Sequence, residues 1–273
     1  MSSAKISVLM GVFNCGDTLA EAIESIENQS YPLWKMIICD DGSSDNTYDV
    51  AAQYANRDPE RILLLKNSTN RGLNFTLNRC LEYADTEFVA RMDGDDISLP
   101  DRFEKLINAF DEEPALAVVS SAMMFFDESG VWGECGAAYE YPQPEQLVKA
   151  SAHFHAPCMI RTEVLKAVDG YTDNKKLIRV EDKHLWMKIY AGGWRGKNLA
   201  SALYMMRDDR NAKKRRNLRA RINGAYVTSL TIRTLKLPKK NYVYAVRPLF
   251  VWALPSGLYR VLHRKKIHMR KTG

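Results

Sequence analysis

Short apolar runs alternate with amphipathic segments over roughly the first 125 residues of the chain. An almost uninterrupted apolar run at residues 5–13 predicts a strand buried on both faces, as in the centre of a parallel sheet. Four similar runs predict further strands at residues 34–40, 61–66, 88–92 and 117–126. Between these strands, apolar residues at helical spacing predict helices at residues 18–28, 46–56, 74–84 and 100–112.

This alternation of strands and helices predicts an α/β domain, built on a mostly parallel sheet that is flanked by helices. The first helix has Thr18 as a candidate N-cap, and Glu21 three residues later completes a capping box. In such sheets ligands bind beyond the carboxyl ends of the strands. The residues at those ends are Phe13-Asn14, Asp40-Asp41 and Asp93-Gly94-Asp95. We therefore expect a ligand at that edge of the sheet.

The second half of the chain is less regular than the first. Residues 128–157 carry Gly, Pro and aromatic side chains and predict loops and short strands over the rim of the sheet, where substrate-binding surface is often built. A helix is predicted at residues 162–168 and a strand at residues 202–206. Glu181-Asp182 opens another predicted helix at residues 183–190, and the simplest role for these acids is to cap it.

Three carboxylates, Asp93, Asp95 and Asp96, directly follow a predicted strand, and only Gly94 lies between them. Carboxylates this close repel one another, so the cluster is costly unless a cation sits among them. Mg²⁺ or Mn²⁺ prefers oxygen ligands, and Mg²⁺ in particular bridges carboxylates to substrate phosphates. The cluster therefore indicates a nucleoside-diphosphate site, with a solvated acidic turn as the alternative.

The chain has no glycine-rich phosphate-binding loop. No Gly-x-Gly-x-x-Gly follows the first predicted strand, because Gly11 and Gly16 lack the spacing, and no Gly-Lys-Ser/Thr sequence is present. We therefore interpret Asp93 and Asp95 as ligands of a cation that binds the diphosphate in place of such a loop.

The cysteines indicate a reducing compartment, and the apolar runs do not indicate a signal peptide or a membrane span. The five cysteines are odd in number, scattered and without a Cys-x-x-Cys pair, which argues against a disulfide framework or a zinc site. Residues 1–5 are polar and unlike a signal peptide, and no run of about 18 apolar residues is present. We expect a cytoplasmic protein.

The charges divide the chain near residue 206. From Arg207 to the end there are 19 Lys/Arg and two acids, a balance of +17, whereas the first 206 residues hold 20 basic and 31 acidic residues, a balance of −11. We therefore expect a domain at residues 1–206 and a basic, amphipathic helical region at residues 207–273.

A basic helix is predicted at residues 210–236, with a polar face that contains Arg215, Arg216, Arg219 and Arg221. The opposite side of this helix contains Leu218, Ile222, Ala225, Tyr226, Ser229 and Leu230. An apolar stretch at residues 242–262 follows, broken by Arg247, Pro248 and Pro255, and basic residues at 263–266 and 270–271 end the chain. Such a region suits the interface of an anionic membrane; the alternative is packing on the domain with solvated basic faces.

Four motifs resemble those of family 2 glycosyltransferases in order and rough spacing. They are Val8–Asn14, Cys39–Asp45, Met92–Asp96 and Glu181–Trp186, and they span about three quarters of the chain. The family consists of inverting enzymes of the GT-A fold that use nucleotide-sugar donors. The whole length further resembles the glycosyltransferases of bacterial exopolysaccharide, capsule and biofilm synthesis.

The resemblance implies a role for each matching residue of a donor site. Phe13 corresponds to the family's tyrosine that stacks on uracil, and Asp41 to the acid that accepts the uracil N3–H. Asp93 would contact the ribose or the metal, and Asp95 would hold the divalent cation against the diphosphate. Arg71, a looser match, would reach the nucleotide.

The resemblance also assigns the general base and shows departures from the family pattern. Asp182 would deprotonate the acceptor hydroxyl, which attacks C1 opposite the diphosphate. Gly11 stands where Pro or Thr is usual, and residues 204–208 lack the family's His, which puts a His metal ligand in doubt. His155 matches a His-x-x element, for which acceptor-side and structural roles remain open.

These observations predict a metal-dependent enzyme that transfers a sugar from a UDP-sugar to a lipid-linked exopolysaccharide or capsule repeat unit. It would lie peripherally on the cytoplasmic face of an anionic membrane, and nucleic acid is not expected as a partner. One alternative is nucleotidyl transfer to a sugar phosphate, disfavoured because the glycine- and lysine-rich first loop of such enzymes is absent. The other is a non-catalytic or regulatory protein that binds nucleic acid or protein through the basic C-terminal region.

Overall fold

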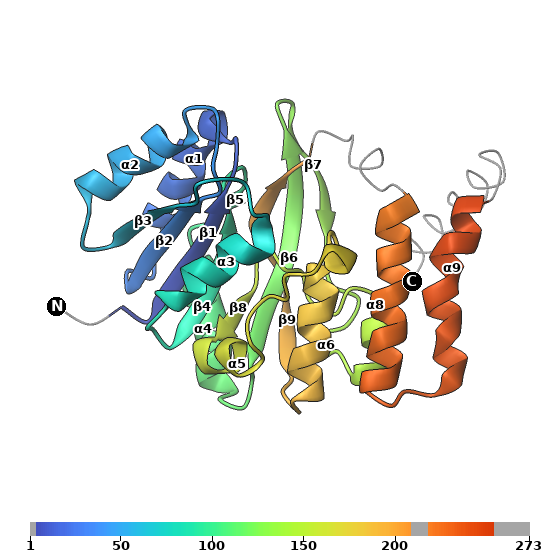
Figure 1. Ribbon diagram of the computed structural model, residues 1–273. Coiled ribbons are helices and arrows are strands. Elements are labelled where there is room, and N and C mark those ends of the chain that lie inside the picture. Colours follow the sequence, from blue (N-terminus) through green and yellow to red (C-terminus); the bar gives the residue numbers. More distant parts are fainter. Residues whose placement is uncertain (1–3, 209–217, 254–273) are drawn as a thin grey trace.

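Nine strands form one sheet across residues 4–208 and 218–253, the parts of the chain that the computed structural model describes (Figure 1). Its N-terminal half consists of parallel neighbours in the order β3-β2-β1-β4, as the apolar runs predict. The bounds are Ile6–Val12 for β1, Trp34–Asp40 for β2, Ile62–Lys66 for β3 and Phe88–Asp93 for β4. The expectation of an α/β fold with a mostly parallel sheet is confirmed.

The other half of the sheet is mixed. The short strand β8 (Met159–Arg161) lies antiparallel between β4 and β6 (Val118–Asp127). The last long strand, β9 (Gly196–Arg207), runs parallel to β6 and starts six residues before the predicted strand at 202–206. At the edges, β5 (Ile97–Ser98) pairs with β9 and β7 (Gly130–Cys135) pairs with β6, both antiparallel.

Helices cover both faces of the sheet because the strand side chains alternate between two cores. Val8 and Met10 point into one core and Leu9 into the other, as period-two alternation requires. The first core contains side chains of α1 (Gly16–Glu27), α2 (Thr47–Arg57) and α4 (Arg102–Glu112). The second contains side chains of α3 (Leu73–Glu82), α5 (Thr162–Ala167) and α6 (Glu181–Ala191). Three short 3₁₀ turns, η1 (Pro144–Val148), η2 (Lys175–Leu177) and η3 (Lys239–Asn241), complete the described elements.

The capping box predicted for the first helix is wrong. Helix α1 begins at Gly16 with Cys15 as its N-cap, so Thr18 lies inside the first turn. The Thr18 hydroxyl donates to the Gly94 carbonyl at 2.9 Å, and Glu21 pairs with Arg207. The Thr18 hydroxyl also contacts the Cys15 carbonyl at 3.2 Å, so these side chains tie α1 to the acidic loop and to β9 without forming a capping box.

Two antiparallel helices, α8 (Leu218–Thr234) and α9 (Tyr242–Ala253), lie beside α6 at the end of the molecule away from β3 (Figure 1). Helix α9 continues through Pro248, although the sequence predicts a break there. No helix in the described ranges combines the length and apolarity needed to cross a membrane. The expected positions of Arg215, Arg216, Pro255 and the basic residues at 263–266 and 270–271 fall outside the described residues.

The most apolar side of α8 is not the side that packs against the domain. Leu218, Ile222 and Tyr226 are exposed, although they belong to its most apolar stripe. The helix instead docks through a row of smaller and polar residues: Asn223, Val227, Thr228, Thr231 and Ile232. Hydrophobic periodicity selects the most apolar face, but here contact with η2 and α6 determines which face is buried.

His153 is a fully buried histidine between β9 and α6. Its Nδ1–H donates to Asn198 Oδ1 at 2.7 Å, because that oxygen can only accept, and its Nε2 accepts from the Tyr190 hydroxyl at 3.0 Å. Burial lowers the pKa of His153 to about 4. The folded protein therefore holds this ring neutral.

The buried His153 predicts a stability loss in mild acid. Since its pKa of about 4 lies below the unfolded value of about 6.5, the unfolded chain binds an extra proton between these pH values. The corresponding stabilisation is fully present above pH 6.5 and is lost as the pH falls through 4, up to about 3 kcal/mol. Urea unfolding at several pH values should show a flatter profile for His153→Gln, and equal slopes for the two proteins would contradict this.

Candidate active site

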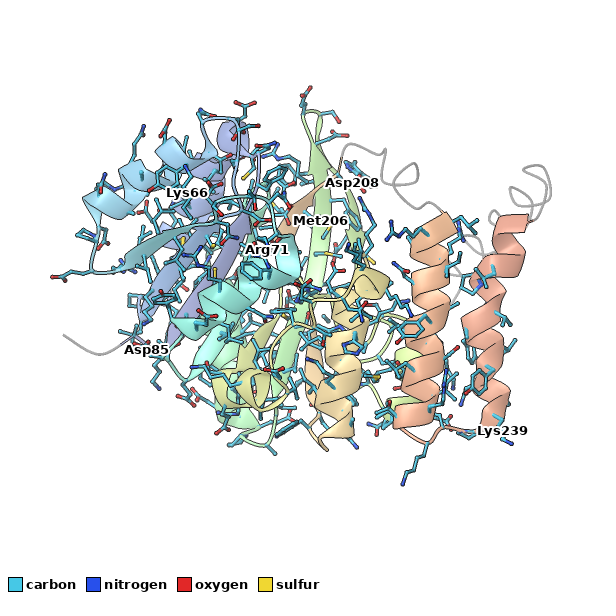
Figure 2. The ribbon with its side chains drawn as sticks, in the orientation of Figure 1. Lys66, Arg71, Asp85, Met206, Asp208 and Lys239 are labelled. Atoms are coloured by element: carbon cyan, nitrogen blue, oxygen red, sulfur yellow. The ribbon has the colours of Figure 1, made fainter. Side chains whose placement is uncertain are left out.

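The carboxyl ends of β1 and β4 open into a pocket of about 480 Å³. Its walls are residues 11–18 at the end of β1, Asp45, Asp93-Gly94-Asp95 at the end of β4, and Arg207 at the end of β9. Phe13 is 45% exposed there, which leaves its ring available to stack on a planar ligand. Figure 2 shows Lys66 and Met206, near the ends of β3 and β9, on this side of the sheet and Asp85 on the opposite side.

Asp93 is fixed by a guanidinium on its own strand. Arg91 Nη2 donates to both carboxylate oxygens of Asp93, at 2.7 and 2.9 Å. Residues two apart on a strand point to the same face, so the sequence contains the signal for this pair. The Arg91 side chain is 11% exposed, and the ion pair is therefore largely shielded from water.

His155 continues the network from Arg91 away from the pocket. Arg91 Nη1 lies 2.6 Å from His155 Nδ1 and, because a guanidinium only donates, Nδ1 is the acceptor. Nε2 therefore carries the proton and donates to the Tyr171 hydroxyl at 2.9 Å. Burial, and secondarily the Arg91 charge, hold the pKa of His155 well below its usual value. Of the two roles left open for His155, its burial and these contacts support the structural one.

Asp95 and Asp96 carry the electrostatic cost that the sequence predicts. Burial, and then the neighbouring Asp93 charge, raise the pKa of Asp95. Burial and the Asp93 and Asp95 charges raise the pKa of Asp96 to about 8, although its carboxylate accepts the Arg207 N–H at 2.8 Å. A divalent cation at Asp95 would relieve this repulsion, so the donor set fits one. Within the described residues no group of three His, Cys, Asp or Glu side chains converges on a single point.

Arg207 brings a positive charge to the same pocket. Its Nε donates to the Asp95 carbonyl at 2.9 Å, and its guanidinium pairs with Glu21. Arg207 was not among the predicted site residues; only the absence of a histidine from residues 204–208 was noted. Asp45 was missed as well; it accepts the Gly16 N–H at 3.1 Å and the Thr47 hydroxyl at 2.6 Å, which shapes the pocket wall.

Asp41, at the end of β2, is buried beside the pocket rather than in its lining. Its Oδ1 accepts from Asn67 Nδ2 at 2.7 Å and from the Arg71 N–H at 2.9 Å, and its Oδ2 accepts the Gly72 N–H at 2.8 Å. Gly72 has a φ of 89°, which glycine adopts without strain. Asp41 therefore folds the turn before α3, and the Arg71 guanidinium lies 4.1 Å from the Phe75 ring (Figure 2).

Asp41→Asn is expected to destabilise the fold by about 2 kcal/mol. In the unchanged protein both carboxylate oxygens accept backbone N–H groups, and the amide NH₂ of the variant cannot accept one of them. Urea denaturation measures the change, with Asp49→Asn on the exposed side of α2 as the control. Equal stability of Asp41→Asn and the control would show that these hydrogen bonds contribute little.

Asp182 lies in the first turn of α6, where the N-cap is Val180 and forms no side-chain capping bond. Burial raises the pKa of Asp182, although Lys183 and Arg91 favour its charged form. Burial and Asp182 likewise raise the pKa of Glu181, and Arg91 opposes that shift too. Arg91 is thus ion-paired with Asp93, and its charge also favours the ionised forms of Glu181 and Asp182.

The structure brings only some of the predicted residues together. Phe13, Asp93 and Asp95 share the pocket, whereas Asp41 and Arg71 lie next to it and Asp182, in the first turn of α6, is outside its lining. Arg91, which pairs with Asp93, was not among the predicted site residues.

A family model described as "Glycosyl transferase family 2" matches residues 7–168. The chain is 39% identical over 272 residues to a Bacillus subtilis (strain 168) protein named as glycosyltransferase EpsE, covering 100% of this chain and 98% of that one. It is 33% identical over 108 residues to the Escherichia coli UDP-Glc:alpha-D-GlcNAc-diphosphoundecaprenol beta-1,3-glucosyltransferase WfgD, covering 40% of this chain and 42% of that one.

Among solved structures, the fold is similar to that of S. aureus TarS 1–349 in complex with UDP. The TM-score is 0.67 at 20% sequence identity, over 93% of this chain and 76% of that one. The expected GT-A architecture is therefore confirmed.

Proposed function

Because the chain belongs to glycosyl transferase family 2 and is related to exopolysaccharide biosynthesis enzymes, we propose that it transfers a sugar from a UDP-sugar to a lipid-linked saccharide with inversion. The observation that carries this proposal is the pocket at the carboxyl ends of β1 and β4, which brings the exposed Phe13 ring together with the Asp93 and Asp95 carboxylates. Family membership argues against nucleotidyl transfer as the main activity.

In this proposal the pocket binds the nucleotide. The exposed Phe13 ring stacks on uracil, and a lone pair left on Asp41 accepts the uracil N3–H. Arg207 offers its guanidinium to the diphosphate, a group that arginine recognises well. Arg71 reaches the nucleotide only if its side chain leaves Phe75.

Asp95, assisted by Asp93, would hold Mg²⁺ or Mn²⁺, which supplies charge stabilisation for the departing diphosphate. Asp93 is already paired with Arg91, so Asp95 is the better-suited ligand and Asp93 is suited to the ribose. Arg91 fixes the Asp93 carboxylate in both roles.

Asp182 is the proposed general base. Its raised pKa makes the carboxylate a better proton acceptor than an exposed aspartate, while Lys183 and Arg91 favour the ionised form that a base needs. Asp182 takes the proton of the acceptor hydroxyl, whose oxygen bonds to C1 as the bond from C1 to UDP breaks. One displacement of this kind inverts the anomeric centre.

The acceptor and its location are proposed from charge and from one relative. WfgD is named for a diphosphoundecaprenol-linked substrate, and a lipid-linked diphosphate is anionic. The +17 balance after residue 206 would attract such a molecule and the inner face of an anionic membrane. The apolar residues among these charges support a bilayer over nucleic acid.

Calorimetric titration with UDP, GDP and ADP, each with and without Mn²⁺, tests the donor site. We expect UDP to bind most tightly and Mn²⁺ to strengthen its binding. Absence of UDP binding under every metal condition would overturn the donor assignment, and preference for GDP or ADP would overturn the choice of uracil.

A further inference from the structure

An exposed apolar ridge runs beside the start of α6. It consists of Ile178, which follows η2, and Leu218, Ile222 and Tyr226 of α8. These side chains are 51%, 40%, 52% and 39% exposed, respectively. The three α8 residues are spaced four apart and therefore lie along one side of the helix.

Positive charges surround this ridge. Lys175, Lys176 and Arg179 come from residues 174–180, which contain no carboxylate, and the exposed Arg219 comes from α8. Lys176 Nζ lies 5.6 Å from the centre of the Tyr226 ring, so the two elements present their charges and apolar groups together. Residues 218–249 contain seven Lys/Arg and no acid.

The ridge is held rigidly to the proposed general base. Leu177 and Val180 form a small buried core with Val227 of α8, and Asn223 Nδ2 donates to the Ile178 carbonyl at 3.1 Å. Helix α6 begins at Glu181, so Asp182 follows this anchored segment directly. A surface that binds the ridge therefore fixes the position of Asp182 as well.

We propose that the ridge inserts into the interface of an anionic lipid bilayer, which holds Asp182 near the headgroups where the diphosphate of a lipid-linked acceptor lies. This inference rests on the proposed function for the role of Asp182. Interleaved aliphatic and basic side chains fit a bilayer interface, whereas an acidic protein or a nucleic acid would use the charges and leave Ile178 and Ile222 in water.

The test is sedimentation of the full-length protein with phosphatidylcholine vesicles, with and without phosphatidylglycerol. The double variant Ile178→Ser/Ile222→Ser should lose binding to the anionic vesicles by about tenfold or more, because two aliphatic groups leave the interface. Leu63→Ser on β3, a residue 40% exposed at the far end of the sheet, is the matched control and should bind as the unchanged protein does. Wild-type affinity of the double variant would overturn the proposal.

A charge variant, Lys175→Glu/Lys176→Glu, tests the basic rim independently and should also lose about tenfold or more. The opposite outcome is that the protein binds DNA or polyglutamate more tightly than vesicles, and loses that binding in this charge variant but not in Ile178→Ser/Ile222→Ser. That result would overturn the bilayer in favour of a polyanion. UDP titration separates the two proposals. Wild-type protein that binds anionic vesicles through the ridge but binds no UDP would contradict the proposed donor site alone.

Discussion

Asp182→Asn is expected to lower kcat for sugar transfer by about three orders of magnitude, because an amide cannot take the proton of the acceptor hydroxyl. The variant also lacks the negative charge that Lys183 and Arg91 favour at this position. Asp182 does not line the donor pocket. UDP affinity should therefore stay within about twofold of wild type.

Initial rates of UDP release and calorimetry with UDP measure the two effects in parallel. Asp173→Asn, an exposed acid ahead of α6, is the matched control and should transfer sugar at the wild-type rate. Since burial raises the pKa of Asp182, kcat should rise with pH above the ordinary aspartate range, and this acid limb should vanish in Asp182→Asn. A variant with kcat near the wild-type value would exclude Asp182 as the base.

Asp95→Asn is expected to remove most of the Mn²⁺ dependence of UDP binding and to weaken UDP binding in Mn²⁺ by about a hundredfold. The variant relieves the repulsion from Asp93, so the protein should fold at least as stably as wild type. This combination of unreduced stability and lost ligand binding is typical of a residue whose role is to bind a ligand rather than to stabilise the fold.

Calorimetry with UDP at fixed Mn²⁺, together with urea unfolding, measures both parts of this prediction. Asp101→Asn, a half-exposed acid that pairs with Lys105 at the start of α4, is the control. Unchanged Mn²⁺-dependent UDP binding in Asp95→Asn would show that the cation is held elsewhere. Loss of stability would show that Asp95 has a structural role.

The sequence predicts the first half of the fold well because each element there carries its own pattern. The runs that become β1, β2 and β4 are apolar, and parallel strands buried on both faces leave few other possibilities. The acids after β2 and β4 stand at strand ends, so the edge where ligands bind can be predicted as well.

Elements that depend on partners far away in the chain could not be predicted. Strand β8 has only three residues and owes its place to pairing with β4 and β6 on either side. The early part of β9 includes the exposed Ala200 and Ser201, so it exists through its ladder with β6 rather than through apolarity. Long-range pairing of this kind leaves no local signal.

The same limit applies to the site. Arg91 could be inferred to face Asp93 from the two-residue spacing, but nothing in the sequence connects Arg91 to His155 or His155 to Tyr171. The capping box failed for a similar reason, because the Thr18 hydroxyl has a better partner in the carbonyl of Gly94, 76 residues away. Hydrogen bonds between side chains that are distant in sequence become visible only in three dimensions.

The most direct test of the account is to identify the product made from a panel of UDP-sugars and an undecaprenyl-diphosphate-linked saccharide in Mn²⁺. Mass spectrometry detects the added sugar, and NMR gives the configuration of its new linkage. We predict one extended lipid-linked saccharide whose anomeric configuration is opposite to that of the donor, and none with Asp182→Asn. Retention of configuration would contradict the single displacement, and no product with any UDP-sugar would contradict the proposed donor.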